Sequence, residues 1–171
     1  MPRKNKRKKT EYQNRLGFDP RKYVTRHSSV LNTGYSKGRI PQHGRTPRRG
    51  DIWFADLGDH LGANVQGGCR PVFIISNDVG NMHSDTLNVL PMTGNLKKLD
   101  LPCHLAVQPE KVSDAHQPFH VSMILAEQIT TISKAQLKNY VGQVEDTALL
   151  GQIDRTVCLQ LGLSRKHLNK E

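Results

Sequence analysis

An arginine and a threonine at the ends of two β-rich runs could act together on a phosphodiester. Arg70 follows a double glycine and precedes the run Pro71–Ser76, and Thr93 closes the next run, Thr86–Met92. If the two runs pair as neighbouring strands, the two side chains come together at one end of a sheet. A guanidinium offers planar, bidentate donors to phosphate oxygens, and a neighbouring hydroxyl can donate to the same group.

Four motifs around this pair resemble the MazF/PemK family of toxin endoribonucleases. They occupy residues 49–57 (RGDIWFADL), 67–72 (GGCRPV), 86–95 (TLNVLPMTGN) and 124–129 (ILAEQI). Their order and spacing follow the family, and the resemblance runs from about Arg49 to Leu163. It implies a mainly β (α+β) fold: a small SH3-like β-barrel of the MazF/PemK/CcdB type with a short helix and a C-terminal helix.

The resemblance also implies which residues act. The catalytic pair is Arg70 and Thr93, and the RNA-binding face includes Asn64, Gln66, Gly67, Gly68, Glu127 and Gln128. Asn64 and Val65 stand where many members carry a serine and a glutamate, which bears on base preference more than on chemistry. The double glycine forms a plain turn, lets a phosphate approach the backbone, or does both.

The activity so implied is sequence-specific, metal-independent cleavage of single-stranded RNA. The 2′-hydroxyl attacks the adjacent phosphorus and leaves 2′,3′-cyclic phosphate and 5′-hydroxyl ends. Arg70 and Thr93 suit the charge that gathers on the nonbridging oxygens. With a pKa above about 12, arginine is a poor base and a plausible acid toward the leaving oxygen, so the general base stays unassigned.

The expected partners are single-stranded RNA, a cognate antitoxin protein that occludes the RNA groove, and a second copy of the chain in a homodimer. Two other functions stay open. One is a non-catalytic RNA- or ribosome-binding protein, and the other is a gyrase-poisoning toxin built on the same barrel.

The positive charge is concentrated at the N-terminus. Residues 1–49 hold 15 Lys and Arg against two acidic residues, a net charge of +13, and residues 50–171 carry −3, which together make the +10 of the chain. Residues 1–46 are predicted to form a basic arm of low order, because few of their side chains could bury a core. The arm either contacts RNA without sequence preference or only aids solubility. Its candidate contacts are Arg3, Lys4, Lys6, Arg7, Lys8 and Lys9.

The predicted toxin domain covers residues 47–163, followed by a tail over 164–171. Short β-rich runs predict a barrel with strands at 52–55, 71–76, 86–92, 104–107 and 122–126. A turn is predicted at 77–81, and Pro91 suits an edge strand. A Ser-x-x-Gln capping box at Ser133 predicts a short helix to about Tyr140. A second helix is predicted over 145–161, since apolar residues recur at helical spacing at Leu149, Ile153, Val157 and Leu161.

Composition argues against several other classes. No run of 18 apolar residues predicts a transmembrane helix, and the basic N-terminus lacks the apolar centre of a secretion signal. Cys69, Cys103 and Cys158 are widely separated with no CxxC pair, which predicts free thiols in a reducing cytoplasm. The eight histidines show no metal-ligand spacing, so neither a metal site nor a cofactor is expected.

Overall fold

The computed structural model describes residues 45–60 and 64–163 of the chain. In these ranges an eight-stranded antiparallel sheet has the order β4-β6-β3-β2-β1-β8-β5, and β7 also pairs with β3. Its strands are β1 (Asp51–Asp56), β2 (Cys69–Ile74), β3 (Thr86–Thr93), β4 (His104–Val107), β5 (Val112–Ser113), β6 (Ser122–Leu125), β7 (Thr130–Ser133) and β8 (Leu137–Val144). The helices are α3 (Asp78–His83) and α4 (Thr147–Gln160), with 3-10 turns η1 (Pro109–Lys111), η2 (Ala126–Gln128) and η3 (Lys134–Gln136). The predicted class, mainly β with a short helix and a C-terminal helix, is confirmed.

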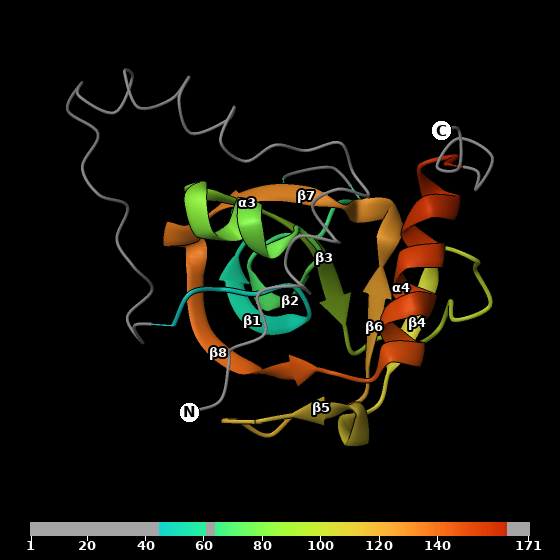
Figure 1. The fold of residues 1–171 in the computed structure, drawn as a ribbon. Coiled ribbons are helices and arrows are strands. Elements are labelled where there is room, and N and C mark those ends of the chain that lie inside the picture. The colour runs from blue at the N-terminus through green and yellow to red at the C-terminus, as the bar shows by residue number, and fades with distance from the viewer. Residues whose placement is uncertain (1–44, 61–63, 164–171) are drawn as a thin grey trace, which may run out of the picture. The chain divides into compact units, whose positions relative to one another are not determined.

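The sheet curls along the pairing of β8 with β1. The register of this pairing shifts twice, between Ile52 and Trp53 and between Trp53 and Ala55. Such irregularities bend a strand and increase its twist. Figure 1 shows β8 curving around β1 and β2 before its far end reaches β5. The bend therefore closes the sheet on itself enough to enclose a core.

Two apolar clusters lie on opposite faces of the central strands. Neighbouring residues alternate between them, since Ile52 and Phe73 belong to one cluster and Trp53 and Val72 to the other. This is the two-residue period of a strand with both faces covered. The first cluster continues into α4 and the second into β7 and β8. Both faces of β2 are thus buried from Val72 to Ile74, and the half-buried Arg70 precedes this buried part of the strand.

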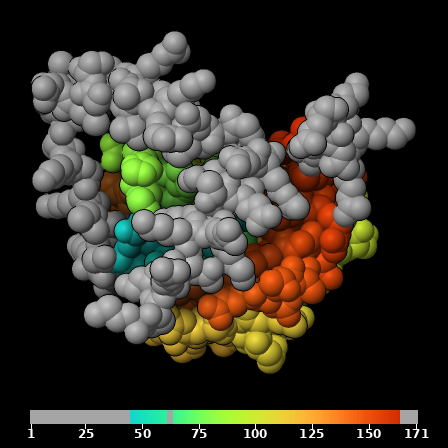
Figure 2. Space-filling view, in the orientation of Figure 1, coloured from blue at the N-terminus to red at the C-terminus, as the bar shows by residue number. Residues whose placement is uncertain are grey.

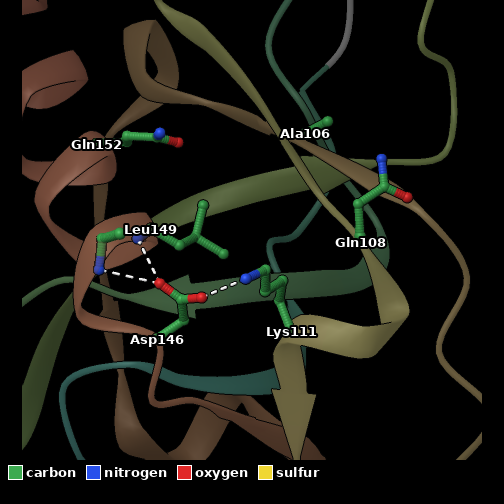
Figure 3. Close-up of a pocket in the computed structure, with 7 residues that line it drawn as sticks. Ala106, Gln108, Lys111, Asp146, Leu149 and Gln152 are labelled. Carbon is green, nitrogen blue, oxygen red and sulfur yellow. Dashed lines mark hydrogen bonds and ion pairs between the residues drawn. The ribbon is translucent and has the colours of Figure 1, made fainter.

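The C-terminal helix α4 starts at an aspartate cap. Asp146 accepts hydrogen bonds from the backbone amides of Ala148 (2.9 Å) and Leu149 (3.0 Å), and it also pairs with Lys111 (Figure 3). The bond from Lys111, followed by the one from the Leu149 amide, lowers the pKa of Asp146. The predicted helix is thus present, but Leu161 lies past its last turn and is exposed. In Figure 2 the orange and red atoms of this C-terminal segment are visible on the face in view.

Local signals misled the prediction at two places. The predicted turn at 77–81 is the start of α3, capped by the side chain of Asn77. The capping box of Ser133 forms as predicted, but it opens only the single 3-10 turn η3. Residues 137–144 then continue as strand β8 and not as a helix to Tyr140. Pairing with β1 and burial of Tyr140 outweigh the local helical preference there.

Pro91 lies on an internal strand of the sheet, although a proline suits an edge strand. β3 pairs with β2 on one side and with β6 and β7 on the other. The ladder to β7 ends at Val89 and the ladder to β6 begins at Met92. Ile75, the residue directly after β2, donates its amide to the carbonyl of Asn88 on β3, so these two residues form a hydrogen-bonded pair. Hydrogen-bonded and non-hydrogen-bonded pairs alternate along an antiparallel ladder. Three pairs further along, Pro91 therefore forms a non-hydrogen-bonded pair with Val72. The proline nitrogen therefore faces the gap between β7 and β6, where no strand needs its missing N–H.

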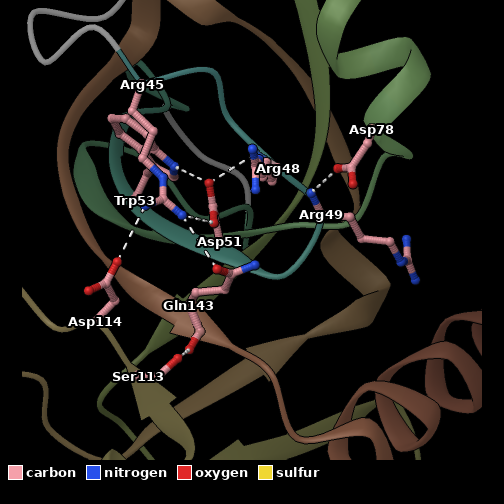
Figure 4. Close-up of polar contacts among 9 residues, drawn as sticks. All are labelled: Arg45, Arg48, Arg49, Asp51, Trp53, Asp78, Ser113, Asp114 and Gln143. Carbon is pink, nitrogen blue, oxygen red and sulfur yellow. Dashed lines mark hydrogen bonds and ion pairs between the residues drawn. The ribbon is translucent and has the colours of Figure 1, made fainter. Parts of the chain in front are cut away.

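A buried charge fastens the segment before β1 to the barrel (Figure 4). The fully buried carboxylate of Asp51 accepts bonds from the Arg48 amide (2.9 Å), the Arg45 guanidinium (3.2 Å) and the Trp53 indole (3.4 Å). Arg45 also lies 4.2 Å from the ring centroid of Tyr140. Burial raises the pKa of Asp51, and the three donors only partly oppose that effect. Burial likewise raises the pKa of Tyr140 to about 12.

None of the helices within 45–60 and 64–163 is long and apolar enough to cross a membrane.

Candidate active site

The predicted catalytic residues lie on two paired strands, β2 and β3. The ladder between these strands matches Val72 with Pro91 and Ile74 with Val89. Arg70 comes two residues before Val72 on β2, and Thr93 comes two residues after Pro91 on β3, so the same register continued beyond the ladder would oppose them. Thr93 itself pairs with Met123 of β6.

Arg70 is held by the loop that precedes it. Its Nε donates to the carbonyl of Gly67 at 2.8 Å, and its Nη1 donates to the side-chain oxygen of Gln66. A guanidinium carries five N–H donors, so these bonds leave three of them without a partner among the described residues. The half-buried side chain is therefore fixed in direction while part of its fork stays available to a ligand.

The loop itself is tied to η2 by Gln128. The Gln128 side-chain oxygen accepts from the Gln66 amide at 2.7 Å, and its side-chain nitrogen donates to the Asn64 carbonyl at 3.2 Å. Both ends of one amide are thus used to hold the loop. Four of the predicted RNA-face residues therefore form one hydrogen-bonded network with the arginine: Asn64, Gln66, Gln128 and, through its carbonyl, Gly67.

The double glycine is required by close backbone contact. A Cβ at Gly67 would lie 2.7 Å from the carbonyl oxygen of Gly58. Gly68 has φ of +70° and donates its amide to the same oxygen at 2.7 Å. Any side chain at Gly67 would push the loop away from Gly58 and move the carbonyl that orients Arg70. The interpretation as a tight structural turn is the one that these contacts support.

The described residues leave the hydroxyl proton of Thr93 without a partner. Its Oγ1 accepts a hydrogen bond from the Asn95 amide at 3.1 Å. A hydroxyl has one donor and two acceptor positions, so the bond from Asn95 fixes the oxygen while leaving the O–H to rotate toward a ligand. A guanidinium fork and a hydroxyl donor on neighbouring strands suit the nonbridging oxygens of a phosphate.

Glu127, the neighbour of Gln128, takes part in a different cluster. Its carboxylate lies 3.1 Å from Nε2 of His104, and the ligand atoms of Cys103, His104 and Glu127 all lie within 4.8 Å of one another. Burial, and then the charge of Glu127, raises the pKa of the Cys103 thiol. Sequence reasoning missed Cys103 and His104. The signal available was their position at the start of the predicted strand 104–107, which pairs with the strand that leads to Glu127.

Comparison with known proteins assigns the chain to a family. The sequence model of the PemK-like, MazF-like toxins of type II toxin-antitoxin systems matches residues 48–161, about two thirds of the chain. The chain belongs to this family. The resemblance seen in its four motifs is therefore confirmed.

Solved structures of MazF/PemK relatives share the fold. The chain is 26% identical to an endoribonuclease in complex with its cognate antitoxin from a mycobacterial species, covering 69% of this chain and 97% of that one at a TM-score of 0.54. It is 24% identical to an endoribonuclease from a mycobacterial species, over 70% and 94% of the two chains, at a TM-score of 0.53. It is 18% identical to MazF from Deinococcus radiodurans, over 69% and 98%, at a TM-score of 0.56. The last two likenesses establish the fold alone.

Within this MazF/PemK fold, the predicted site residues fall into separate groups. Arg70 and Gln128 join the loop network, Thr93 lies on the strand next to that of Arg70, and Glu127 pairs with His104. Six predicted RNA contacts of the N-terminal arm lie outside the described residues. They are Arg3, Lys4, Lys6, Arg7, Lys8 and Lys9.

Proposed function

We propose that this MazF/PemK family member is an endoribonuclease that cleaves single-stranded RNA at specific short sequences without a metal ion. The observation that carries the proposal is that Arg70 and Thr93 lie on the paired strands β2 and β3, where the described residues leave hydrogen-bond donors of both side chains without a partner. Such donors bind phosphate oxygens directly. The RNA supplies the nucleophile, its 2′-hydroxyl, so the protein needs to activate no water.

In the proposed reaction, the scissile phosphate lies between the Arg70 fork and the Thr93 hydroxyl. The 2′-oxygen bonds to phosphorus as the bond to the 5′-oxygen breaks, which yields a 2′,3′-cyclic phosphate and a 5′-hydroxyl. Negative charge grows on the nonbridging oxygens during this step, and donors already in place stabilise it. Arg70 is also placed to act as the acid toward the departing 5′-oxygen. The loop from Asn64 to Gly68, together with Gln128, would contact the flanking nucleotides.

Two partners and a location follow from the same assignment. We expect a cognate antitoxin protein, since a relative of 26% identity is found in complex with its own. We expect a homodimer, since the described residues expose large apolar side chains that include Val79, Met82 and Leu159. A cytoplasmic location fits the three cysteines, which are all free.

The decisive experiment incubates the purified full chain with a long single-stranded RNA in EDTA and maps the ends of the products. We expect discrete cuts, 5′ ends that a kinase phosphorylates directly, and 3′ ends that poly(A) polymerase extends only after removal of the cyclic phosphate. A 2′-deoxy nucleotide at a mapped site should block that cut alone. Arg70→Ala protein serves as the control for a contaminating nuclease.

Other results would overturn specific parts of the proposal. Activity lost in EDTA and restored by magnesium or manganese contradicts metal independence. Cutting across the 2′-deoxy position contradicts attack by the 2′-hydroxyl. RNA that is bound but stays intact would make the protein a binding protein on the same fold.

A further inference from the structure

Three metal-ligand side chains gather beside the RNA face although the sequence predicts no metal site. His104, at the start of β4, pairs with Leu125, at the end of β6. The amide of Ala126 donates to the carbonyl of Cys103 at 3.0 Å. These backbone contacts fix Cys103 and His104 against the turn η2 that carries Glu127. The thiol of Cys103, the imidazole of His104 and the carboxylate of Glu127 thereby lie close together, although His104 and Glu127 are 23 residues apart in the sequence.

The distances suit a tetrahedral zinc ion. Zinc binds nitrogen and oxygen at about 2.0–2.2 Å and sulfur at about 2.3 Å, so tetrahedral ligand atoms lie roughly 3.3–3.6 Å from one another. Nε2 of His104 and Oε1 of Glu127 are 3.1 Å apart, and all three ligand atoms lie within 4.8 Å of one another. Closing the largest gap requires a shift of about 1 Å, which rotation of the Cys103 or Glu127 side chain can supply.

The second contact of His104 supports the same assignment. Its Nδ1 lies at the carbonyl oxygen of Lys98, and a carbonyl can only accept, so Nδ1 carries the proton. Nε2 is then the ring atom that faces Glu127, and a zinc ion bound between the two side chains would replace that contact. Metal-binding histidines characteristically donate their other N–H to a carbonyl or carboxylate, and here the Lys98 carbonyl fills that role.

We propose that Cys103, His104 and Glu127 bind a zinc ion, with the fourth coordination position open, and that zinc bound there inhibits RNA cleavage. Three protein ligands with an open position can accept a water molecule or a phosphate oxygen. His104 is nearly buried and Glu127 is half-exposed, with 4% and 31% of their side-chain surface accessible, so the open position faces solvent on the Glu127 side. Glu127 directly precedes Gln128, which holds the loop around Arg70. An ion there fixes η2 and can capture a phosphate away from Arg70.

Cobalt spectroscopy of the full chain tests the site itself. Cobalt(II) bound to a thiolate gives a near-ultraviolet charge-transfer band, and zinc should remove that band by displacement. Cys103→Ser should abolish the band and weaken zinc binding by at least about a hundredfold, measured by competition with a chromophoric chelator. Glu127→Gln should keep the band and weaken zinc binding. Cys158→Ser is the matched control, since Cys158 is a free thiol on α4 and outside the cluster. Absence of the band in the wild type, or its persistence in Cys103→Ser, overturns the site.

The regulatory half rests on the proposed RNA cleavage and is tested separately. Equimolar zinc should slow cleavage by the wild type and by Cys158→Ser at least about tenfold, and it should leave Cys103→Ser unaffected. Equal slowing of all three proteins overturns inhibition through this site. If the protein cleaves no RNA at all, the proposed function fails while the cobalt spectrum still decides whether zinc binds.

Discussion

Replacing Arg70 by lysine separates the geometry of the guanidinium from its charge. In the structure, Nε donates to the Gly67 carbonyl and Nη1 to Gln66, which leaves the remaining N–H groups for a phosphate. A lysine keeps one positive charge but has a single nitrogen, so it cannot hold both loop contacts and also offer a fork to phosphate. Arg70→Lys should therefore behave almost like Arg70→Ala.

The magnitude follows from the donors that each variant removes. Removing one preorganised donor to a developing oxyanion costs about 10²–10³ in rate, or about 2.7–4 kcal/mol. Arg70 offers up to three such donors, so Arg70→Ala should lose at least about a hundredfold. Arg70→Lys should recover less than about tenfold of that loss, because its ammonium is free to point elsewhere. Both losses should appear in the single-turnover rate at saturating RNA more than in RNA affinity.

The assay is single-turnover cleavage of a short oligonucleotide that contains a mapped site, in EDTA. Circular dichroism and thermal unfolding check that each variant is folded. Arg155→Ala is the matched control, since Arg155 is an exposed arginine on α4. A folded Arg70→Ala protein that cleaves at the wild-type rate refutes the assignment. A lysine variant with wild-type activity refutes the argument from fork geometry.

Three further predictions use other parts of the structure. Gly67→Ala puts a Cβ 2.7 Å from the Gly58 carbonyl oxygen and should slow cleavage up to about a hundredfold by displacing the loop, whereas Gly94→Ala, where a Cβ meets open space, should cleave normally in the same assay. Because burial raises the folded-state pKa of Asp51 above 3.8, its contribution to stability falls as pH rises from 3.8 through the folded pKa. Denaturant unfolding across that range should show the decline in the wild type and not in Asp51→Asn. A chain lacking residues 1–44 should still cut short RNA, while the slope of its log affinity for long RNA against log salt should drop by about 0.7 for each phosphate that the arm neutralises in the full chain. An unchanged slope would make the arm a passive tail.

The pairing of the strands that carry Arg70 and Thr93 was predictable from the sequence, because these strands follow one another along the chain. Arg70 and Thr93 mark the ends of neighbouring β-rich runs joined by a short connection, and such runs pair antiparallel. The double glycine was visible as a loop for the same local reason. The fold class followed from five short β-rich runs and a helical C-terminus, all of which are local patterns.

What the sequence missed depends on pairing between distant segments. Residues 137–144 include Lys138, Asn139 and Gly142, which are poor strand formers, and a genuine capping box precedes them. Pairing with β1 decides their conformation, and no local window contains β1. Strand propensity is mostly a matter of such context. How an internal strand accommodates Pro91 was likewise not visible, because the gap between β7 and β6 exists only once both strands are placed.

The cluster around Glu127 also depends on pairing between distant segments, and it bears on the catalytic site. Glu127 and Gln128 are adjacent, yet one side chain pairs with His104 and the other holds the loop of Arg70. The 3-10 turn η2 makes this division, because side chains of successive residues in a tight helical turn point in different directions. Any event that moves Glu127 must act through the same short turn on Gln128, and through Gln66 on the guanidinium. The turn therefore links the proposed zinc site to the proposed catalytic arginine through two side-chain contacts, without a rearrangement of the barrel. Cys103 directly precedes β4 and His104 begins it, and the sequence around them shows no metal-ligand spacing. They become candidate zinc ligands only because the β4–β6 register places them beside that turn.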